Sequence, residues 1–139
     1  MKISTRTRYG IRAMLEIAQG SSGTGVFQKD IANNQQISNK YLDHIIYALK
    51  TSQLISNLKG KKSGYVLTRN PSEITILDIH NAFEPGICVI ECLSGNYECD
   101  RSVGCKTKDF WGGLNNMILE YFRSVTLQDL IDNKSLLLN

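Results

Sequence analysis

All four cysteines of the chain lie within one short stretch, and their type and spacing could support metal or redox chemistry. Cys88, Cys92, Cys99 and Cys105 are separated by three, six and five residues, and glycines and Asn96 loosen the backbone between them. Three or four thiolates could therefore converge on one point, and soft thiolates bind iron-sulfur clusters and zinc. The stretch predicts a metal site, although it lacks tight C-x2-C pairs. Two disulfides or four buried free thiols are the alternatives.

The length and composition of the chain indicate how many domains it forms and in which cellular compartment we expect it. The chain has 139 residues, of which 42% are hydrophobic, enough for one domain with an ordinary core. The N-terminus lacks a long apolar segment, and no window approaches about 18 consecutive apolar residues, so neither a signal peptide nor a membrane span is expected. We therefore expect a cytoplasmic protein. Its reducing compartment disfavours structural disulfides and favours metal binding or redox sensing.

Positive charge is concentrated in the first half of the chain. Residues 1–70 hold 11 of the 16 lysines and arginines but only 3 of the 13 acidic residues, so residues 71–139 are acidic. A basic half joined to an acidic remainder fits a module that binds nucleic acid with one end and a partner with the other. Lysines scattered over a solvated surface would give the same count, so charge alone does not decide the function.

The basic half has the pattern of a helix-turn-helix followed by a β-hairpin. Apolar residues at three- and four-residue steps predict helices over 5–19, over 27–34 and from Ser38 onward, the last with one apolar and one polar face. Alternating residues at 54–58 and 65–68 flank a lysine-rich turn, which predicts a basic wing. Such a combination can straddle a DNA backbone. The candidate DNA-binding residues are Arg6, Arg8, Ser38, Lys40, Tyr41, Asp43, His44, Tyr47, Lys59, Lys61 and Lys62.

The longest periodic run of apolar residues follows the cysteines. Its large side chains are Trp111, Leu114, Ile118, Tyr121, Phe122 and Val125. Each would contribute roughly 1.5–3 kcal/mol if it were fully buried, yet so short a chain has little left to cover them. We therefore expect this helix to pack against the same helix of a second copy, giving a homodimer.

These segments predict a mainly α fold with one small β-hairpin, arranged as a winged helix-turn-helix domain and a long dimerisation helix. We place the DNA-binding domain at 1–84, the cysteine-containing loop at 85–108, and the dimerisation helix and C-terminal tail at 109–139. An enzyme is not expected, because the chain has only 2 histidines and no evident pair of nucleophile and base. The stretch GSSGTG at 20–25 lacks the context of a phosphate-binding loop and is interpreted as a flexible connector.

Several segments resemble the Rrf-two family of winged-helix regulators, in particular its IscR- and NsrR-like members. They are ISTRTRYGIRAMLEIA at 3–18, DIANNQQISNKYLDHIIYALKTSQLI at 30–55, KGKKSGYVLTR at 59–69, the cysteine stretch, DFW at 109–111 and VTLQDL at 125–130. The similarity extends from Met1 to about Asn133. It implies a dimeric repressor that binds a pseudo-palindromic operator in double-stranded DNA. It also implies control by an iron-sulfur cluster, 2Fe–2S in preference to 4Fe–4S, that senses redox state, nitric oxide or iron-sulfur status.

The resemblance implies three cluster ligands in this chain, Cys92, Cys99 and Cys105. It does not supply the fourth, because Lys108 stands where IscR-like members have a histidine and Arg8 stands where NsrR-like members have an acidic residue. Neither side chain coordinates iron. Cys88 is the expected substitute, and Glu84, Glu91, Glu98 and Asp100 are harder alternatives. A cluster-free regulator with a thiol/disulfide switch and a zinc-stabilised interaction module remain open as other functions.

Overall fold

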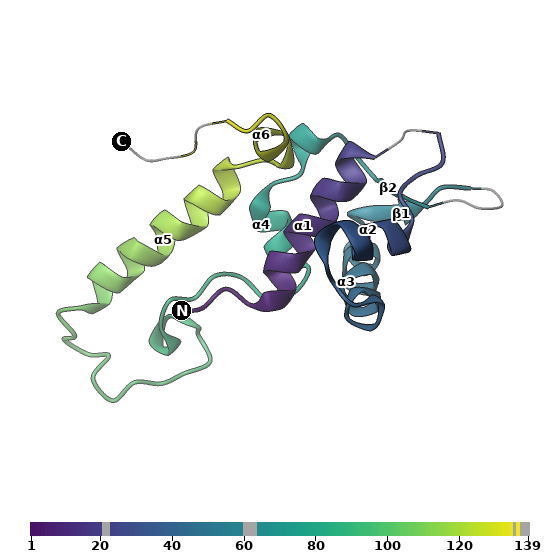
Figure 1. Ribbon diagram of the computed structural model, residues 1–139. Helices are drawn as coiled ribbons and strands as arrows, with labels where there is room; N and C mark the ends of the chain where they lie inside the picture. The colour runs from purple at the N-terminus through teal and green to yellow at the C-terminus, as the bar shows by residue number, and fades with distance from the viewer. Residues whose placement is uncertain (21–22, 60–63, 135, 137–139) are drawn as a thin grey trace.

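Two parts of the molecule are distinguished in Figure 1, a body made by most of the elements and an arm made by α5 with the loop before it. The computed structural model describes residues 1–20, 23–59, 64–134 and 136. The helices and strands are α1 (Thr5–Gln19), α2 (Gln28–Gln35), α3 (Asn39–Thr51), β1 (Ile55–Asn57), β2 (Tyr65–Leu67), α4 (Ile76–Asn81), α5 (Lys108–Ser124) and α6 (Leu127–Ile131), with short 3-10 turns η1 (Pro71–Glu73) and η2 (Glu91–Leu93). We call α1–α4, β1, β2 and α6 the head.

Serine caps fix the starts of two of the helices that build the head. The Ser4 side chain accepts a hydrogen bond from the backbone N–H of Thr7, and Ser38 accepts one from Tyr41. The apolar faces that follow these caps pack into one core. Its fully buried members come from every helix of the head and include Ala13, Met14, Ile31, Leu42, Ile45, Leu49, Ile74, Ile79 and Leu127. The predicted mainly helical fold with a small hairpin is confirmed.

The β-hairpin is held to the rest of the head by a third extended segment. Strands β1 and β2 are antiparallel, with Ser56 opposite Val66. On the other side of β2, the N–H groups of Val26 and Tyr65 each donate to the other residue's carbonyl, at 2.9 and 2.8 Å. A Cβ atom on Gly64 would lie 2.5 Å from the backbone of Val26, so this approach requires glycine. At the end of the stretch interpreted as a connector, the Thr24 carbonyl accepts a hydrogen bond from the Gly64 N–H at 2.7 Å, so this end is paired with the hairpin.

The chain returns from α5 to the head through a paired turn. Thr75 and Thr126 each form a capping box, with Asp78 and Asp129 respectively, at the starts of α4 and α6. The two threonines also pair as an antiparallel bridge. Because this bridge draws the chain into the head, Val125 is only 5% exposed and belongs to the head core. Its assignment to a surface for a second copy is corrected on this ground.

Helix α5 differs from the other long helices because none of its 17 residues is buried. Exposed on it are Phe110, Leu114, Met117 and Tyr121, and Met117 reaches 67% exposure. It contacts the head mainly through α4, and its far end carries the loop that contains the cysteines (Figure 1). Within the described ranges, no helix is long and apolar enough to cross a bilayer.

Candidate nucleic-acid interface and cysteine site

Helix α3 separates a packing face from a polar face. Leu42, Ile45, Ile46 and Leu49 are buried in the head core. The outer face carries Lys40, Asp43, His44 and Tyr47, all exposed, and Tyr47 is 73% exposed. Cationic and hydrogen-bonding side chains on one face of a helix are suited to contact base edges and phosphates. The outward position expected for these four residues is the one observed.

Two residues that the sequence reasoning missed order the surface between α3 and the wing. Gln28 of α2 donates from Nε2 to Asp43 Oδ1 at 2.5 Å, which fixes the Asp43 carboxylate. The Lys50 Nζ atom lies 5.8 Å from the centre of the Tyr65 ring, so a cation is held where the helix meets the hairpin. Burial, and then the charge of Asp43, raises the pKa of the Tyr65 hydroxyl. Lys50 follows Tyr47 by three residues, and this helical spacing could have identified it.

The remaining candidates for DNA contact are placed less uniformly. Ser38 and Lys59 are exposed, whereas Lys61 and Lys62 lie outside the described residues. Tyr41 is half-buried and packs edge-on against Tyr9 of α1, with ring centroids 5.6 Å apart, so packing on α1 occupies part of its ring.

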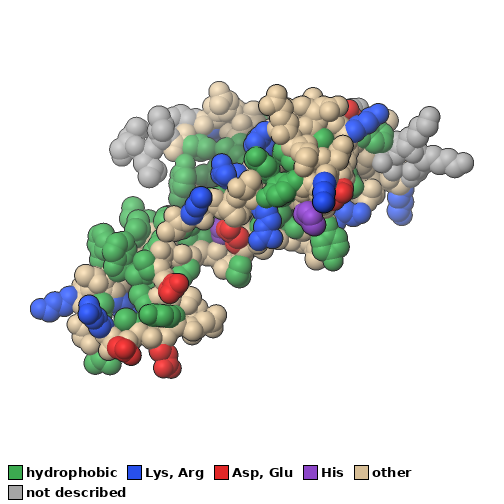
Figure 2. Space-filling model, turned by 60° about the horizontal axis from the view of Figure 1, so that its bottom comes forward, with side chains coloured by type: hydrophobic (Ala, Val, Ile, Leu, Met, Phe, Trp, Pro, Cys, Tyr) green, Lys and Arg blue, Asp and Glu red, His purple; other side chains and the backbone are tan. Residues whose placement is uncertain are grey.

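The two N-terminal arginines are exposed, but the contacts of their side chains are not with α3. Arg6 donates to the carbonyl of Phe83, just after α4, at 3.5 Å, and Arg8 donates to Thr5 at 3.0 Å. Figure 2 shows basic side chains spread over the larger part of the molecule, and a group of apolar side chains on the smaller part at the left of the view.

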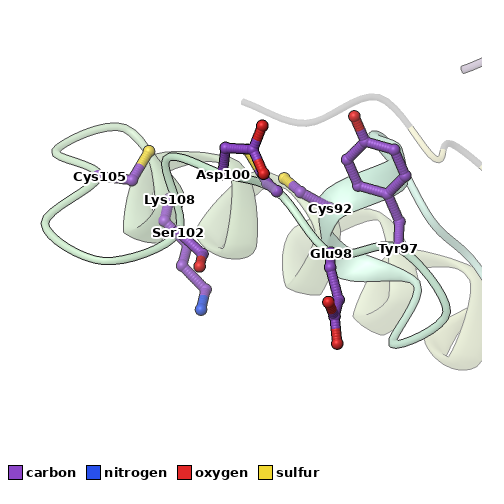
Figure 3. Close-up of a pocket in the computed structure, with 8 residues that line it drawn as sticks. Cys92, Tyr97, Glu98, Asp100, Ser102, Cys105 and Lys108 are labelled. Carbon is purple, nitrogen blue, oxygen red and sulfur yellow. The ribbon is translucent and has the colours of Figure 1, made fainter.

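The cysteine loop, residues 82–107, joins α4 to α5. All four thiols are free; Cys92 and Cys99 are half-buried, and Cys88 and Cys105 are exposed. The structure does not gather them tightly, since no three histidine, cysteine or acidic side chains in the described ranges are close enough to hold a metal ion. Cys92, Cys99 and Cys105 nevertheless line one hollow of about 380 Å³, which we call the cysteine hollow. Glu98, Asp100 and Lys108 line it too, as Figure 3 shows.

The two exposed cysteines have different surroundings. Cys88 lies outside the lining of the hollow and donates from its thiol to the carbonyl of Ile90 at 2.8 Å. The side-chain hydrogen bond with Thr107, followed by the N–H of Thr107 and assisted by the charge of Lys108, lowers the pKa of the Cys105 thiol. Since the thiolate is both the nucleophilic and the metal-binding form of cysteine, Cys105 is set up for either chemistry.

Hydrogen bonds tie the cysteine loop to both of the helices that flank it. The buried His80 of α4 bonds through Nε2 to the Gly86 carbonyl at 2.8 Å, and its ring packs edge-on against Phe122 of α5. The Val89 N–H donates to Asn115 Oδ1 of α5 at 2.9 Å. The start of the loop is therefore joined by hydrogen bonds to both α4 and α5. These anchors were not predicted, because nothing in the local sequence pairs His80 or Asn115 with the loop.

The exposed polar face of α3, the hairpin beside it and the shared core define a winged helix-turn-helix DNA-binding protein. A family model named Rrf2, described as an iron-dependent transcriptional regulator, matches residues 3–133. The chain belongs to the Rrf2 family of transcriptional regulators, and it is a DNA-binding regulator and not an enzyme.

Individual relatives extend along nearly the whole chain. Protein rrf2 of Nitratidesulfovibrio vulgaris is 36% identical over 136 residues, which cover 98% of this chain and 91% of that protein. The transcriptional regulator IscR of Pectobacterium atrosepticum is 29% identical over 137 residues, covering 99% and 83%.

Solved structures agree with the fold. CymR, described as the global cysteine regulator of B. subtilis, superimposes with a TM-score of 0.82 at 29% identity, covering 97% of this chain and 99% of CymR. IscR of T. potens gives a TM-score of 0.76 at 32% identity, covering 97% and 89%. The winged-helix architecture expected from the sequence is therefore confirmed by structures of other regulators.

Proposed function

We propose that this regulator is a repressor whose affinity for its operator is controlled by an iron-sulfur cluster bound by Cys92, Cys99 and Cys105. One observation carries the proposal: these three cysteines, from separate parts of the loop, line the same hollow beside the start of α5. The iron-dependent description of the family and the similarity to IscR support it. The proposal also places the protein in the cytoplasm, where a regulator meets DNA.

The hollow has the donor atoms that an iron-sulfur cluster needs, and it has space for one. Three soft thiolates are the ligands that iron-sulfur clusters use, and 2Fe–2S is the form that we favour. When bound, the cluster would supply a redox-active centre that oxidants can alter. The thiols would have to lose their protons and come closer than they are in this structure. Gly95 and Gly104, whose φ angles are 78° and 76°, give the loop turns at which it can close.

The protein part of the proposed switch consists of the loop anchors. Closing the loop around a cluster would change the hydrogen bonds that join it to His80 of α4 and to Asn115 of α5. Such a change can alter how the head is set relative to α5. The cluster can shift operator affinity only as far as it favours one of these settings over the other.

Dimerisation through α5 is part of this proposal. Of the six side chains predicted for the interface, Trp111, Leu114, Ile118, Tyr121 and Phe122 remain once Val125 is assigned to the head core. A two-fold dimer would present two α3 helices to a pseudo-palindromic operator. Lys40, Asp43, His44 and Tyr47 would then face bases, while Ser38, Lys59, Lys61, Lys62, Arg6 and Arg8 would contribute backbone contacts. The parts 1–84, 85–108 and 109–139 would serve DNA binding, sensing and assembly.

A thiol switch without a cluster is the second candidate. All four cysteines are free, they do not converge, and the pKa of Cys105 is lowered. One solved relative, CymR of Staphylococcus aureus, is described in an oxidized form, with a TM-score of 0.74 at 28% identity, covering 94% of this chain and 95% of that one. A pair of these thiols would then form a disulfide on oxidation and alter DNA binding.

Iron and acid-labile sulfide analysis of protein purified without oxygen tests the proposal. We expect a coloured protein that contains both elements, and their loss from Cys92→Ser, Cys99→Ser and Cys105→Ser. Ser102→Ala, which changes a side chain at the same hollow without removing a thiol, should keep them. A colourless protein whose DNA binding responds to a disulfide would establish the second candidate. A colourless zinc protein that binds no duplex would instead indicate a zinc-stabilised interaction module.

A further inference from the structure

We propose that the carboxylate of Asp100 is the fourth ligand of the cysteine site, in the place that the sequence suggested for Cys88. This inference rests on the proposed function, because it concerns the same cluster. It addresses a specific gap in the chain, since Lys108 and Arg8 stand at the two positions where related regulators would supply the ligand and neither side chain binds iron.

The position of Asp100 relative to the thiols is the main support. Asp100 lines the hollow together with Cys92, Cys99 and Cys105. It directly follows Cys99 in a turn that is closed by a hydrogen bond from the Ser102 N–H to the Cys99 carbonyl, at 2.9 Å. Because the turn folds the chain back, the neighbouring side chains of Cys99 and Asp100 both border the same space. A fourth donor is thus already present on the hollow that the three cysteines line.

The other charged side chains of the hollow are oriented differently. In Figure 3 the Asp100 carboxylate lies on the same side of the loop as the sulfur atoms of Cys92 and Cys105, whereas Glu98 and Lys108 extend toward the opposite side. Glu98 therefore provides an acidic residue on the same hollow that is not aimed at the thiols. It is a matched control for the charge of Asp100.

Cys88 is less suited to complete the site. It does not line the hollow, and its thiol is engaged with the carbonyl of Ile90, two residues along the chain. Recruiting Cys88 would require breaking this bond and moving the start of the loop, which His80 and Asn115 hold through Gly86 and Val89. Recruiting Asp100 requires only closure of the segment in which the three cysteines already lie. A carboxylate is a harder ligand than thiolate, so the iron it binds should be the one released most readily.

Four variants of the 139-residue chain, prepared without oxygen, separate these possibilities. They are Asp100→Asn, Asp100→Cys, Glu98→Gln and Cys88→Ser. The measurements are iron and sulfide per chain, visible circular dichroism, the reduction potential, and the half-life of the cluster against a chelator. Far-ultraviolet circular dichroism of each apo form checks that the fold is retained.

We expect Asp100→Asn to change the visible spectrum and to shorten the half-life by about tenfold or more, the scale on which metal sites respond to altered ligand surroundings. Asp100→Cys should keep the iron, lower the reduction potential and lengthen the half-life, because a thiolate replaces an oxygen donor. Glu98→Gln and Cys88→Ser should match the wild type. An Asp100→Asn protein with wild-type spectrum and half-life overturns the assignment, and loss of iron from Cys88→Ser alone would give the position to Cys88. A wild type without iron refutes the proposed function itself, and this ligand with it.

Discussion

The exposed side chains around α3 differ in what they can recognise in DNA. Lys40 and His44 project from the helix face itself, where base edges are in reach. Lys50 is held over the Tyr65 ring at the boundary with the hairpin, where a duplex backbone would pass. Asp43 is fixed by Gln28 and can orient its neighbours. We therefore expect specificity and affinity to be carried by different residues.

The first prediction concerns this division. Lys50→Ala should weaken binding to all duplexes alike and reduce the log-log salt slope by about one, because one phosphate contact is lost. His44→Ala should cost about 1–3 kcal/mol on the preferred duplex and relax preference at one position. Titrations at several salt concentrations on a duplex selected from random sequence measure both effects. Lys134→Ala is the control, since Lys134 pairs with Asp129 at the start of α6. A Lys50→Ala protein with altered sequence preference and an unchanged salt slope would contradict the assignment.

For single residues, the sequence predicted the polar face of α3 well. Helical periodicity separates the buried stripe from Lys40, Asp43, His44 and Tyr47. Tyr41, which was also assigned to DNA contact, is half-buried at the edge of this face, and its ring packs against Tyr9 of α1. This contact joins residues 32 positions apart in the chain, and a pattern within one helix carries no information about such a partner.

Among the elements of the head, the hairpin depends on a close approach of Gly64 to Val26. The Gly64→Ala substitution should push the hairpin away from the 24–26 segment and cost about 1–3 kcal/mol of unfolding free energy, as overpacking does. DNA affinity should fall as well, because the wing loses its support. Denaturant unfolding measures the first effect and a DNA titration the second. Gly23→Ala, where a Cβ meets nothing within 4 Å, should be nearly neutral. Equal effects of the two substitutions would refute the role given to this contact.

A second prediction about single helices and strands concerns assembly through α5. In the proposed dimer Ile118→Glu would bury an unpaired charge, which costs several kcal/mol and should separate the subunits. Asn116→Glu places the same charge at an exposed polar position of the same helix and should leave assembly intact. Sedimentation velocity distinguishes the two states. An Ile118→Glu protein that remained a dimer and bound DNA normally would remove α5 as the interface.

The elements themselves were largely predictable from the sequence, and their connections were not. Ser4, Ser38 and Thr126 cap helices as short-range patterns suggest. The bridge between Thr75 and Thr126 joins residues 51 positions apart in the chain, and no local signal marks it. The apolar stripe predicted for α5 therefore wrongly included Val125, which belongs to the head core.

At the scale of the whole molecule, the cysteine loop connects α4 of the head to α5. The start of the loop is hydrogen-bonded to both helices, through Gly86 to His80 of α4 and through Val89 to Asn115 of α5. The head holds the proposed DNA contacts and α5 the proposed dimer contacts, so the loop is placed to change the spacing of two α3 helices. The sequence could suggest a sensor here from its cysteines. It could not show that three of them share a hollow and that Cys88 lies outside it.

The most direct test compares operator affinity with and without the cluster in one oxygen-free preparation. The holo protein and the same sample after chelation are titrated against a duplex selected from random sequence. We predict that their dissociation constants differ by about 5- to 150-fold, the range of typical coupling free energies. Cys92→Ser, Cys99→Ser and Cys105→Ser should each behave as the apo protein does before and after chelation. Equal affinities of the iron-loaded and iron-free wild type would contradict control by a cluster, and so would a chelation response that persisted in all three variants.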